Sequence, residues 1–230
     1  MIQQQIDTLL QYFGRDVEEL VKAKAEYFDR TGGEVHEDDR CYEQRMQAFF
    51  NWFLFDRPQG DSTPVERYLR ENGASLSGKE KDILMGFKQS RLALYEYRAR
   101  RGIFSRPKTG QIRVRDVITR ESFDVTERRQ MHGLEIGDLF EARLVPVDRT
   151  WHFSSSFTYH PREVRAAILR EIKRRKKSDG KLDAPGFCWE LERMALQQER
   201  FRNVNVDAIY NFETPFLSKR AARPEAQQRG

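Results

Sequence analysis

At Leu94-Tyr95-Glu96-Tyr97-Arg98-Ala99 the apolar pattern of the chain changes from the helical period to the strand period. Leu94, Glu96 and Arg98 alternate there with two tyrosines and an alanine, and successive residues of a strand point to opposite faces of a sheet. The same alternation returns in four later segments, at residues 112–117, 123–126, 139–145 and 151–156. Five short strands joined by tight turns predict a small antiparallel sheet that closes into a barrel, because closure removes exposed strand edges.

The chain before this stretch is predicted to be helical. Apolar side chains recur at three- and four-residue steps through residues 2–30, where Gly14 is expected to separate two helices. A further helix over about residues 37–55 ends in Phe49-Phe50-Asn51-Trp52-Phe53-Leu54-Phe55. That end is apolar on nearly all sides, so we expect it at the centre of the core rather than in a groove for a partner.

Two capping boxes mark the next helices. Thr63-Pro64-Val65-Glu66 places proline at the first helical position, and Gly73 closes that helix. Ser77-Gly78-Lys79-Glu80 opens another helix, which we expect to end near Ser90. The sequence therefore predicts several packed helices ahead of the barrel.

Helical patterns return after the strands. Pro161 is expected to begin a helix that ends in the basic run 173–177, and Pro185 a helix that reaches about Arg202; the apolar segment 204–210 is left unassigned. The predicted class is α+β, and we expect one cooperative unit because the sheet is small. Its parts are a helical region (1–90), a β-barrel-like module (91–158), two C-terminal helices that pack on the body (159–217) and a disordered tail (218–230).

The composition limits the class of protein. Apolar residues make up 38% and charged residues 33%, but 16 Phe, 8 Tyr and 3 Trp are enough to build a core. No apolar stretch has the length needed to cross a bilayer, and the N-terminus lacks the features of a signal peptide. Cys41 and Cys188 form no paired motif. We therefore expect a cytoplasmic protein with reduced thiols.

No motif predicts catalysis or a cofactor. The glycines occur without the spacing of a phosphate-binding loop or a dinucleotide fingerprint. The densest set of metal-ligand types is His36-Glu37-Asp38-Asp39 with Cys41 and Glu43, and acidic residues at a helix N-terminus explain it without a metal. Ser154-Ser155-Ser156 lie near two histidines, but the polar outer face of a strand is the simpler interpretation. We predict no cofactor and no metal, and an enzyme is not favoured.

Positive charge is concentrated in two blocks of a chain whose net charge is +5. Residues 91–129 carry 11 basic and 5 acidic side chains, and residues 162–181 carry 9 and 3, whereas the rest is acidic or neutral. Such asymmetry predicts an anionic partner, and nucleic acid is the first candidate. An arginine-rich composition that serves only solubility is the alternative, and the lysines at a helix end also suit the helix dipole.

The candidate nucleic-acid-binding residues come from these two blocks. Arg113 and Arg115 are expected to project from one strand face, close to the arginines that end the preceding strand. Two tyrosines that share a face are expected to stack on bases. The full set is Tyr95, Tyr97, Arg98, Arg100, Arg101, Arg106, Lys108, Arg113, Arg115, Lys173, Arg174, Arg175, Lys176 and Lys177.

One family resemblance rests on three segments, which are Phe49-Phe50-Asn51-Trp52-Phe53-Leu54-Phe55-Asp56, Thr63-Pro64-Val65-Glu66 and Ser90-Arg91-Leu92-Ala93-Leu94-Tyr95-Glu96. Over roughly residues 40–145 the chain resembles uncharacterised bacterial proteins that often carry a C-terminal SEC-C zinc-binding motif. The resemblance implies a helical aromatic segment that leads into a small β module. The SEC-C motif needs clustered Cys and His, and only Cys188 follows His160, so the zinc function does not carry over.

The sequence thus predicts a non-enzymatic binding protein whose basic barrel face engages nucleic acid. A second hypothesis is a protein–protein adaptor that uses exposed aromatic residues around Trp52 or Tyr210. A third is an unrecognised enzyme, which would show as a pocket lined with titratable groups of perturbed pKa.

Overall fold

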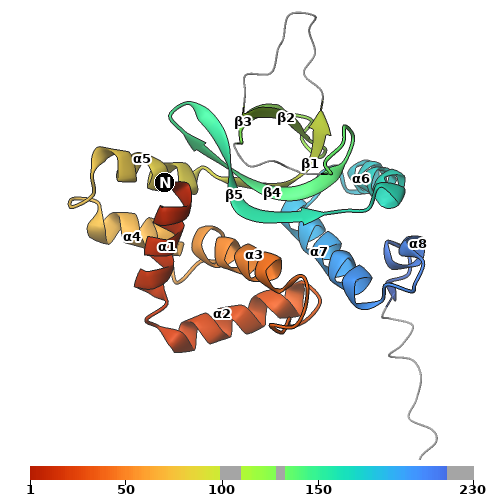
Figure 1. Cartoon of the computed structure of the whole chain (residues 1–230), viewed down its shortest axis with the longest axis horizontal. Helices are drawn as coiled ribbons and strands as arrows, with labels where there is room; N and C mark the ends of the chain where they lie inside the picture. The colour runs from red at the N-terminus through yellow and green to blue at the C-terminus, as the bar shows by residue number, and fades with distance from the viewer. Residues whose placement is uncertain (99–109, 128–132, 217–230) are drawn as a thin grey trace, which may run out of the picture.

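The computed structural model describes residues 1–98, 110–127 and 133–216, which form helices around one small barrel (Figure 1). The elements before the barrel are α1 (Ile2–Phe13), α2 (Val17–Arg30), α3 (Tyr42–Phe55), α4 (Pro64–Asn72) and α5 (Gly78–Lys88). The strands are β1 (Arg91–Arg98), β2 (Gln111–Asp116), β3 (Ser122–Thr126), β4 (Leu139–Val147) and β5 (Thr150–Tyr159). The 3-10 turn η1 (Arg162–Val164) and helices α6 (Arg165–Asp179), α7 (Ala184–Arg200) and α8 (Val206–Ile209) follow. The predicted α+β class is confirmed.

The barrel is closed, in the strand order β1-β2-β3-β5-β4. The prediction that every pair is antiparallel is wrong for one of them, because β3 and β5 run parallel through Val125 opposite Trp151. A closed ring of five strands cannot be antiparallel throughout: direction alternates around the ring, so an odd number leaves one neighbouring pair with the same direction. The β4–β5 hairpin turns at Asp148 and Arg149, both with positive φ, as a two-residue type I′ turn requires.

The interior of the barrel is aromatic and aliphatic. Tyr95, Val114, Val125 and Phe140 are fully buried there and pack together. Their strand neighbours point outward because the side-chain period of a strand is two. This alternation places the even-numbered residues of β1 and the odd-numbered residues of β2 on the outer surface.

Most of the predicted helices are present. The break expected at Gly14 separates α1 from α2, and both capping boxes form, at Thr63 and at Ser77. The helix expected from about residue 37 instead begins at Tyr42. Asp39 accounts for the difference, because its carboxylate accepts a hydrogen bond from the His36 backbone N–H at 2.9 Å and closes a turn there.

Helix α3 lies at the centre of the helical layer, as its apolar end predicts. Phe49, Phe53 and Leu54 are fully buried in the largest cluster of the core. Arg143, which points outward from β4, fastens the barrel to this layer. Its guanidinium donates to Ser90 Oγ at 3.0 Å and to the Asp56 carboxylate, and lies 5.1 Å from the centre of the Phe55 ring.

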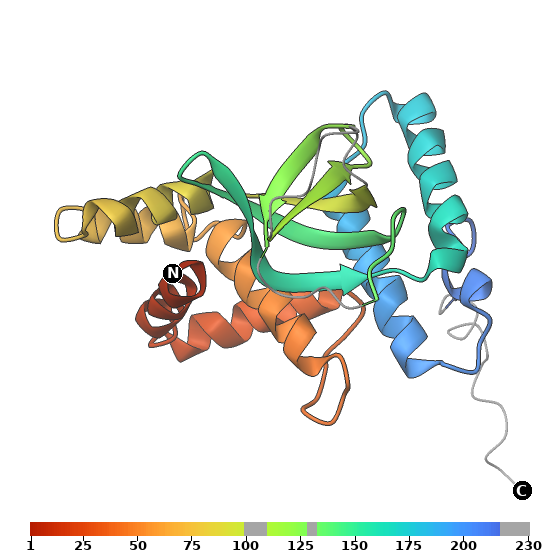
Figure 2. The same ribbon diagram turned by 45° about the horizontal axis from the view of Figure 1, so that its top comes forward.

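The C-terminal helices pack on the barrel from another side. Figure 2 shows α7 crossing behind the barrel while α6 stands beside it. Val164, Ile168 and Ile172 are buried against Leu191 of α7, as expected from their helical spacing. The unassigned apolar segment contains the short helix α8. The predicted disordered tail, 218–230, lies outside the described residues.

Gly86→Ala is expected to destabilise the protein by about 1–3 kcal/mol, because overpacking a filled site has a cost of that order. Gly86 lies in α5, where an added Cβ would overlap the Pro146 carbonyl oxygen of β4. The matched control is Gly78→Ala in the same helix, where an added Cβ meets nothing within 4 Å. Urea unfolding measures both variants, and equal stability of the two would contradict the tight contact between α5 and β4.

Candidate functional site

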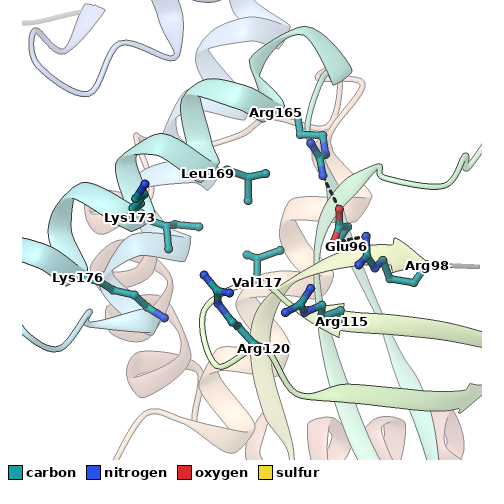
Figure 3. Close-up of a pocket in the computed structure, with 10 residues that line it drawn as sticks. Glu96, Arg98, Arg115, Val117, Arg120, Arg165, Leu169, Lys173 and Lys176 are labelled. Carbon is teal, nitrogen blue, oxygen red and sulfur yellow. Dashed lines mark hydrogen bonds and ion pairs between the residues drawn. The ribbon is translucent and has the colours of Figure 1, made fainter.

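The main candidate site is a cleft of about 510 Å³ between the outer face of β1 and β2 and helix α6 (Figure 3). Glu96 and Arg98 project from β1, and Arg115 projects from β2. In the register of the two strands, Glu96 lies opposite Arg115. The outer face of the barrel therefore gathers these charged groups at one place.

The β2–β3 turn forms a second part of the wall. Its shape is set by Asp116, whose carboxylate accepts from the backbone N–H groups of Ile118 at 2.7 Å and Thr119 at 3.1 Å. Arg120 follows with a φ of +67°, and its side chain lines the cleft. Lys176 of α6 donates to the Ile118 carbonyl, which ties the helix to the turn.

Helix α6 supplies the opposite wall. Arg165, Leu169, Lys173 and Lys176 lie three or four residues apart, or a multiple of that, and so share one helix face. Figure 3 shows Arg165, Leu169 and Lys176 directed toward the strands, and Lys173 lines the cleft beside them. Arg165 is fixed by a 2.8 Å hydrogen bond from its Nε to the Gly137 carbonyl. Leu169 and Val117 give the cleft an apolar floor.

The cleft has a strong excess of positive charge. Its described lining includes six cationic side chains and one carboxylate, Glu96. Glu96 is buried and pairs with Arg98 at 3.3 Å and with Arg165. In the part of the chain that the structure describes, no carboxylate lies within ion-pair distance of Arg115, Arg120 or Lys173. These three cations are therefore available to an anion.

The structure brings together four of the predicted site residues, Arg98, Arg115, Lys173 and Lys176. Arg113 lies opposite Arg98 on the same outer face but does not line the cleft, and it forms a bidentate ion pair with Asp124, at 3.0 and 2.8 Å. Others of the set are outside the described residues, namely Arg100, Arg101, Arg106 and Lys108.

The remaining predicted residues do not face the cleft. Arg174 and Arg175 pair with Glu171, whose pKa is lowered by the hydrogen bonds from Arg174, and Lys177 is exposed outside the cleft lining. The prediction that Tyr95 stacks on bases is wrong, because its ring is fully buried inside the barrel. Tyr97 is half-buried on the same inner face.

Sequence reasoning missed Glu96, Arg120 and Arg165 as members of this site. Arg165 could have been predicted from the sequence, because it lies about two helical turns before Lys173 and about three before Lys176, on the same helix face. Arg120 was not, because a residue in a turn carries no periodic signal. Glu96 was treated only as part of the strand pattern.

A second, larger cleft of about 750 Å³ lies where α3, the start of β1 and the start of α7 meet. Trp52 and Trp189 line it together with charged side chains that have partners of their own. Arg30 and Arg57 pair with Glu26, and Arg91 pairs with Glu121. This cleft therefore offers little net charge to a ligand.

A network of ionisable groups is buried between α2, α3 and α7. Tyr27 donates to Glu192 Oε2 at 2.6 Å, and Arg45 Nη1 lies 3.5 Å from the same oxygen. Arg45 also donates to the Thr31 carbonyl and hydroxyl, at 2.9 and 2.7 Å. Burial raises the pKa of Glu192, and the charge of Arg45, its partner in the ion pair, opposes that shift.

Glu141 and His160 continue this network toward α8. Burial raises the pKa of Glu141 well above its usual range and lowers the pKa of His160 to about 3. The 3.1 Å contact between His160 Nε2 and Glu141 Oε1 is thus a hydrogen bond made by a neutral imidazole. Tyr210 contacts the other ring nitrogen at 3.0 Å.

Two cavities border this network, and the larger, of about 330 Å³, is lined by Arg45 and Glu192 together with Cys41 and Thr158. The smaller, beside Glu141 and Glu192, has a volume of about 10 Å³, which is the size of one water molecule. Among the described residues, no group of three or more His, Cys, Asp or Glu side chains is placed to hold a metal ion.

The adaptor hypothesis predicts exposed aromatic residues around Trp52 or Tyr210, but both of these side chains are buried. The large apolar side chains that are exposed lie elsewhere, and Val17 and Val21 of α2 are examples. The rings of Trp52 and Tyr210 are therefore not that exposed surface, and an adaptor that uses residues around them stays a prediction.

Comparison with known families assigns the chain to a group. Residues 16–194 match the family of unknown function DUF7986. The chain belongs to DUF7986. The match includes all five strands and most of α7, so the cleft between barrel and α6 lies within the DUF7986 region. No match was found among curated proteins or among solved structures.

Proposed function

We propose that this protein binds nucleic acid through the cleft between β1, β2 and α6, as a binding protein rather than an enzyme. The observation that carries the proposal is the meeting of the two basic blocks around one cleft. Arg115 and Arg120 come from the first block, and Lys173 comes from the second, about 50 residues later. A chain that used its basic residues only for solubility would have no reason to gather them.

The chemistry of these groups suits phosphates. Guanidinium groups donate two parallel hydrogen bonds to a phosphate, and an ammonium adds a compact charge. Arg115, Arg120 and Lys173 surround the cleft on two sides, so a phosphodiester backbone between them would contact both walls. Glu96 holds two further arginines in place, which reduces the entropy that they lose on binding.

The barrel supports the same proposal by analogy. The strand order β1-β2-β3-β5-β4, with β3 parallel to β5, is the arrangement of OB-fold barrels, many of which bind oligonucleotides. The connection between β1 and β2, a ligand-binding loop in that fold, carries Arg100, Arg101, Arg106 and Lys108, all outside the described residues. A shared strand order does not fix a function, so the analogy is secondary to the charges of the cleft.

Binding is expected to depend steeply on salt, because cations that contact phosphates release counterions. A variant that combines Arg115→Ala, Arg120→Ala and Lys173→Ala is expected to bind a single-stranded oligonucleotide with a weaker salt dependence. The slope of log affinity against log salt concentration is expected to become less negative by about two. Fluorescence anisotropy between low and physiological salt measures this slope. A duplex of the same sequence, measured in parallel, shows whether the cleft prefers one form.

The matched control removes the same charge elsewhere. Arg15, Lys79 and Lys81 are exposed on α5 and on the link between α1 and α2, so their joint replacement by alanine also lowers the net charge by three. This control is expected to change the slope by much less than the cleft variant. Equal effects of both triple variants, or no binding by the wild type at low salt, would end the proposal.

The cellular setting remains a prediction. In the part of the chain that the structure describes, no helix has the length and apolar character needed to span a membrane. A bacterial, cytoplasmic protein related to those with a SEC-C motif is the setting that the sequence suggests, and nucleic acid is an abundant anion there.

A further inference from the structure

The large cleft of about 750 Å³ is separate from the basic one. It lies on the other side of the β2–β3 turn, where Thr119 faces it while Arg120 faces the basic cleft. Residues from α2, α3, β1, the turn and α7 all line it. Its volume falls in the range of pockets that take small molecules, which is about 300–1,000 Å³.

The charges in its wall are already compensated. Glu26 accepts from Arg30 at 2.6 Å and from Arg57 at 2.8 Å. Asp56 pairs with Arg143, and the carboxylate of Asp116 accepts two backbone N–H groups of its own turn. A charged ligand would lose its hydration here without gaining a free partner of opposite charge, so the cleft favours an uncharged one.

Two tryptophans form part of the apolar wall. Trp189 is half-buried, and Trp52, which is 4% exposed, lines the same cleft. The Arg30 guanidinium lies 5.7 Å from the centre of the Trp52 ring and 5.0 Å from that of Trp189, so it contacts both rings. A flat ring is the ligand shape that stacks best on such a surface.

The edge of β1 adds a hydrogen-bonding pattern. Strand β2 pairs with β1 only from Tyr95 onward, although the Val117 N–H still reaches the Leu94 carbonyl at 3.1 Å. Backbone groups of alternate residues point to the same side of a strand, so the N–H and C=O of Leu92 point to the side that β2 has left. Leu92 also lines the cleft, and it therefore presents one donor and one acceptor to a ligand.

We propose that this cleft binds an uncharged heteroaromatic ring with a donor and an acceptor on one edge, as in a nucleobase. The ring lies against Trp189, and its edge pairs with the backbone of Leu92. This inference is independent of the nucleic-acid proposal, because none of the cations of the basic cleft takes part.

The probes are adenosine, guanosine, cytidine and uridine, each titrated into the full-length protein at neutral pH. At least one is expected to quench tryptophan fluorescence in a saturable way, since two of the three tryptophans line the cleft. The 5′-monophosphate of that nucleoside is expected to bind at least threefold more weakly. Tighter binding of the monophosphate would show an anion site and overturn the proposal.

Two variants locate the site. Trp189→Leu is expected to weaken binding at least tenfold, whereas Trp151→Leu, at a half-buried tryptophan outside the cleft, is expected to leave affinity within twofold. Ala184→Phe places a ring in the cleft without removing a core side chain, and is expected to abolish binding even if Trp189→Leu fails to fold. No saturable quenching by any nucleoside, or unchanged affinity in Ala184→Phe, overturns the inference and leaves the basic cleft unaffected.

Discussion

Arg45→Met is expected to destabilise the protein by about 3–5 kcal/mol, the largest effect that a single substitution in the buried network should have. Arg45 is fully buried, and its guanidinium neutralises Glu192 while it satisfies the Thr31 carbonyl. Methionine fills much of the same volume but leaves a buried carboxylate with Tyr27 as its remaining described donor. That carboxylate must then take up a proton or stay charged without a counterion, and both are unfavourable at neutral pH.

Urea unfolding of Arg45→Met and of the double variant Arg45→Met with Glu192→Gln measures this cost. The double variant is expected to recover part of the loss, because its site no longer holds an unpaired charge. The control is Arg202→Met, which breaks an exposed pair with Glu199 and is expected to change stability by less than about 1 kcal/mol. A loss of under about 1 kcal/mol in Arg45→Met would contradict the network described above.

The helices and strands that have a periodic apolar pattern could be predicted from the sequence, whereas the buried charged side chains could not. Gly14, the two capping boxes and the alternation that starts at Leu94 each carry a local signal, and each marks the element expected from it. Arg45 and Arg143 carry no such signal, because a strand or helix pattern treats an arginine as a surface residue. Only the tertiary structure, in which Arg45 pairs with Glu192 of α7 and Arg143 with Asp56, shows that both arginines are inside.

The candidate site shows the same limit. The charge counts located both basic blocks, but not which members face each other, because that depends on how α6 docks on the outer face of β1 and β2. Arg113 and Arg115 share a strand face as expected, yet Asp124 on the neighbouring strand neutralises the first and leaves the second free. Pairing across a sheet depends on register, which the sequence alone did not give.

Glu141→Gln is expected to remove a loss of stability that begins as the pH rises above 4.5. Burial raises the pKa of Glu141 in the folded protein above its ordinary value of 4.5, so the folded state holds a proton that the unfolded chain releases. The stabilisation from this carboxyl group is complete below that value and is lost as the pH rises toward the folded pKa. His160 acts in the opposite sense: its pKa falls from 6.5 to about 3, so its contribution is present above 6.5 and is lost as the pH falls toward 3.

The wild type and Glu141→Gln share His160, Glu192, Tyr210 and Arg45, so the difference in stability between them isolates the contribution of the Glu141 carboxyl group. Glutamine has the shape of the protonated acid and can keep the hydrogen bond to His160. Its advantage over the wild type is expected to be near zero at pH 4 and to grow by up to about 1.4 kcal/mol per pH unit above pH 4.5. Urea unfolding of both proteins at pH 4, 5, 6, 7 and 8 measures this advantage. If the stabilities of the wild type and of Glu141→Gln change in parallel with pH, the prediction is contradicted. Glu141 is then ionised in the folded protein, and His160 or Arg45 compensates its charge.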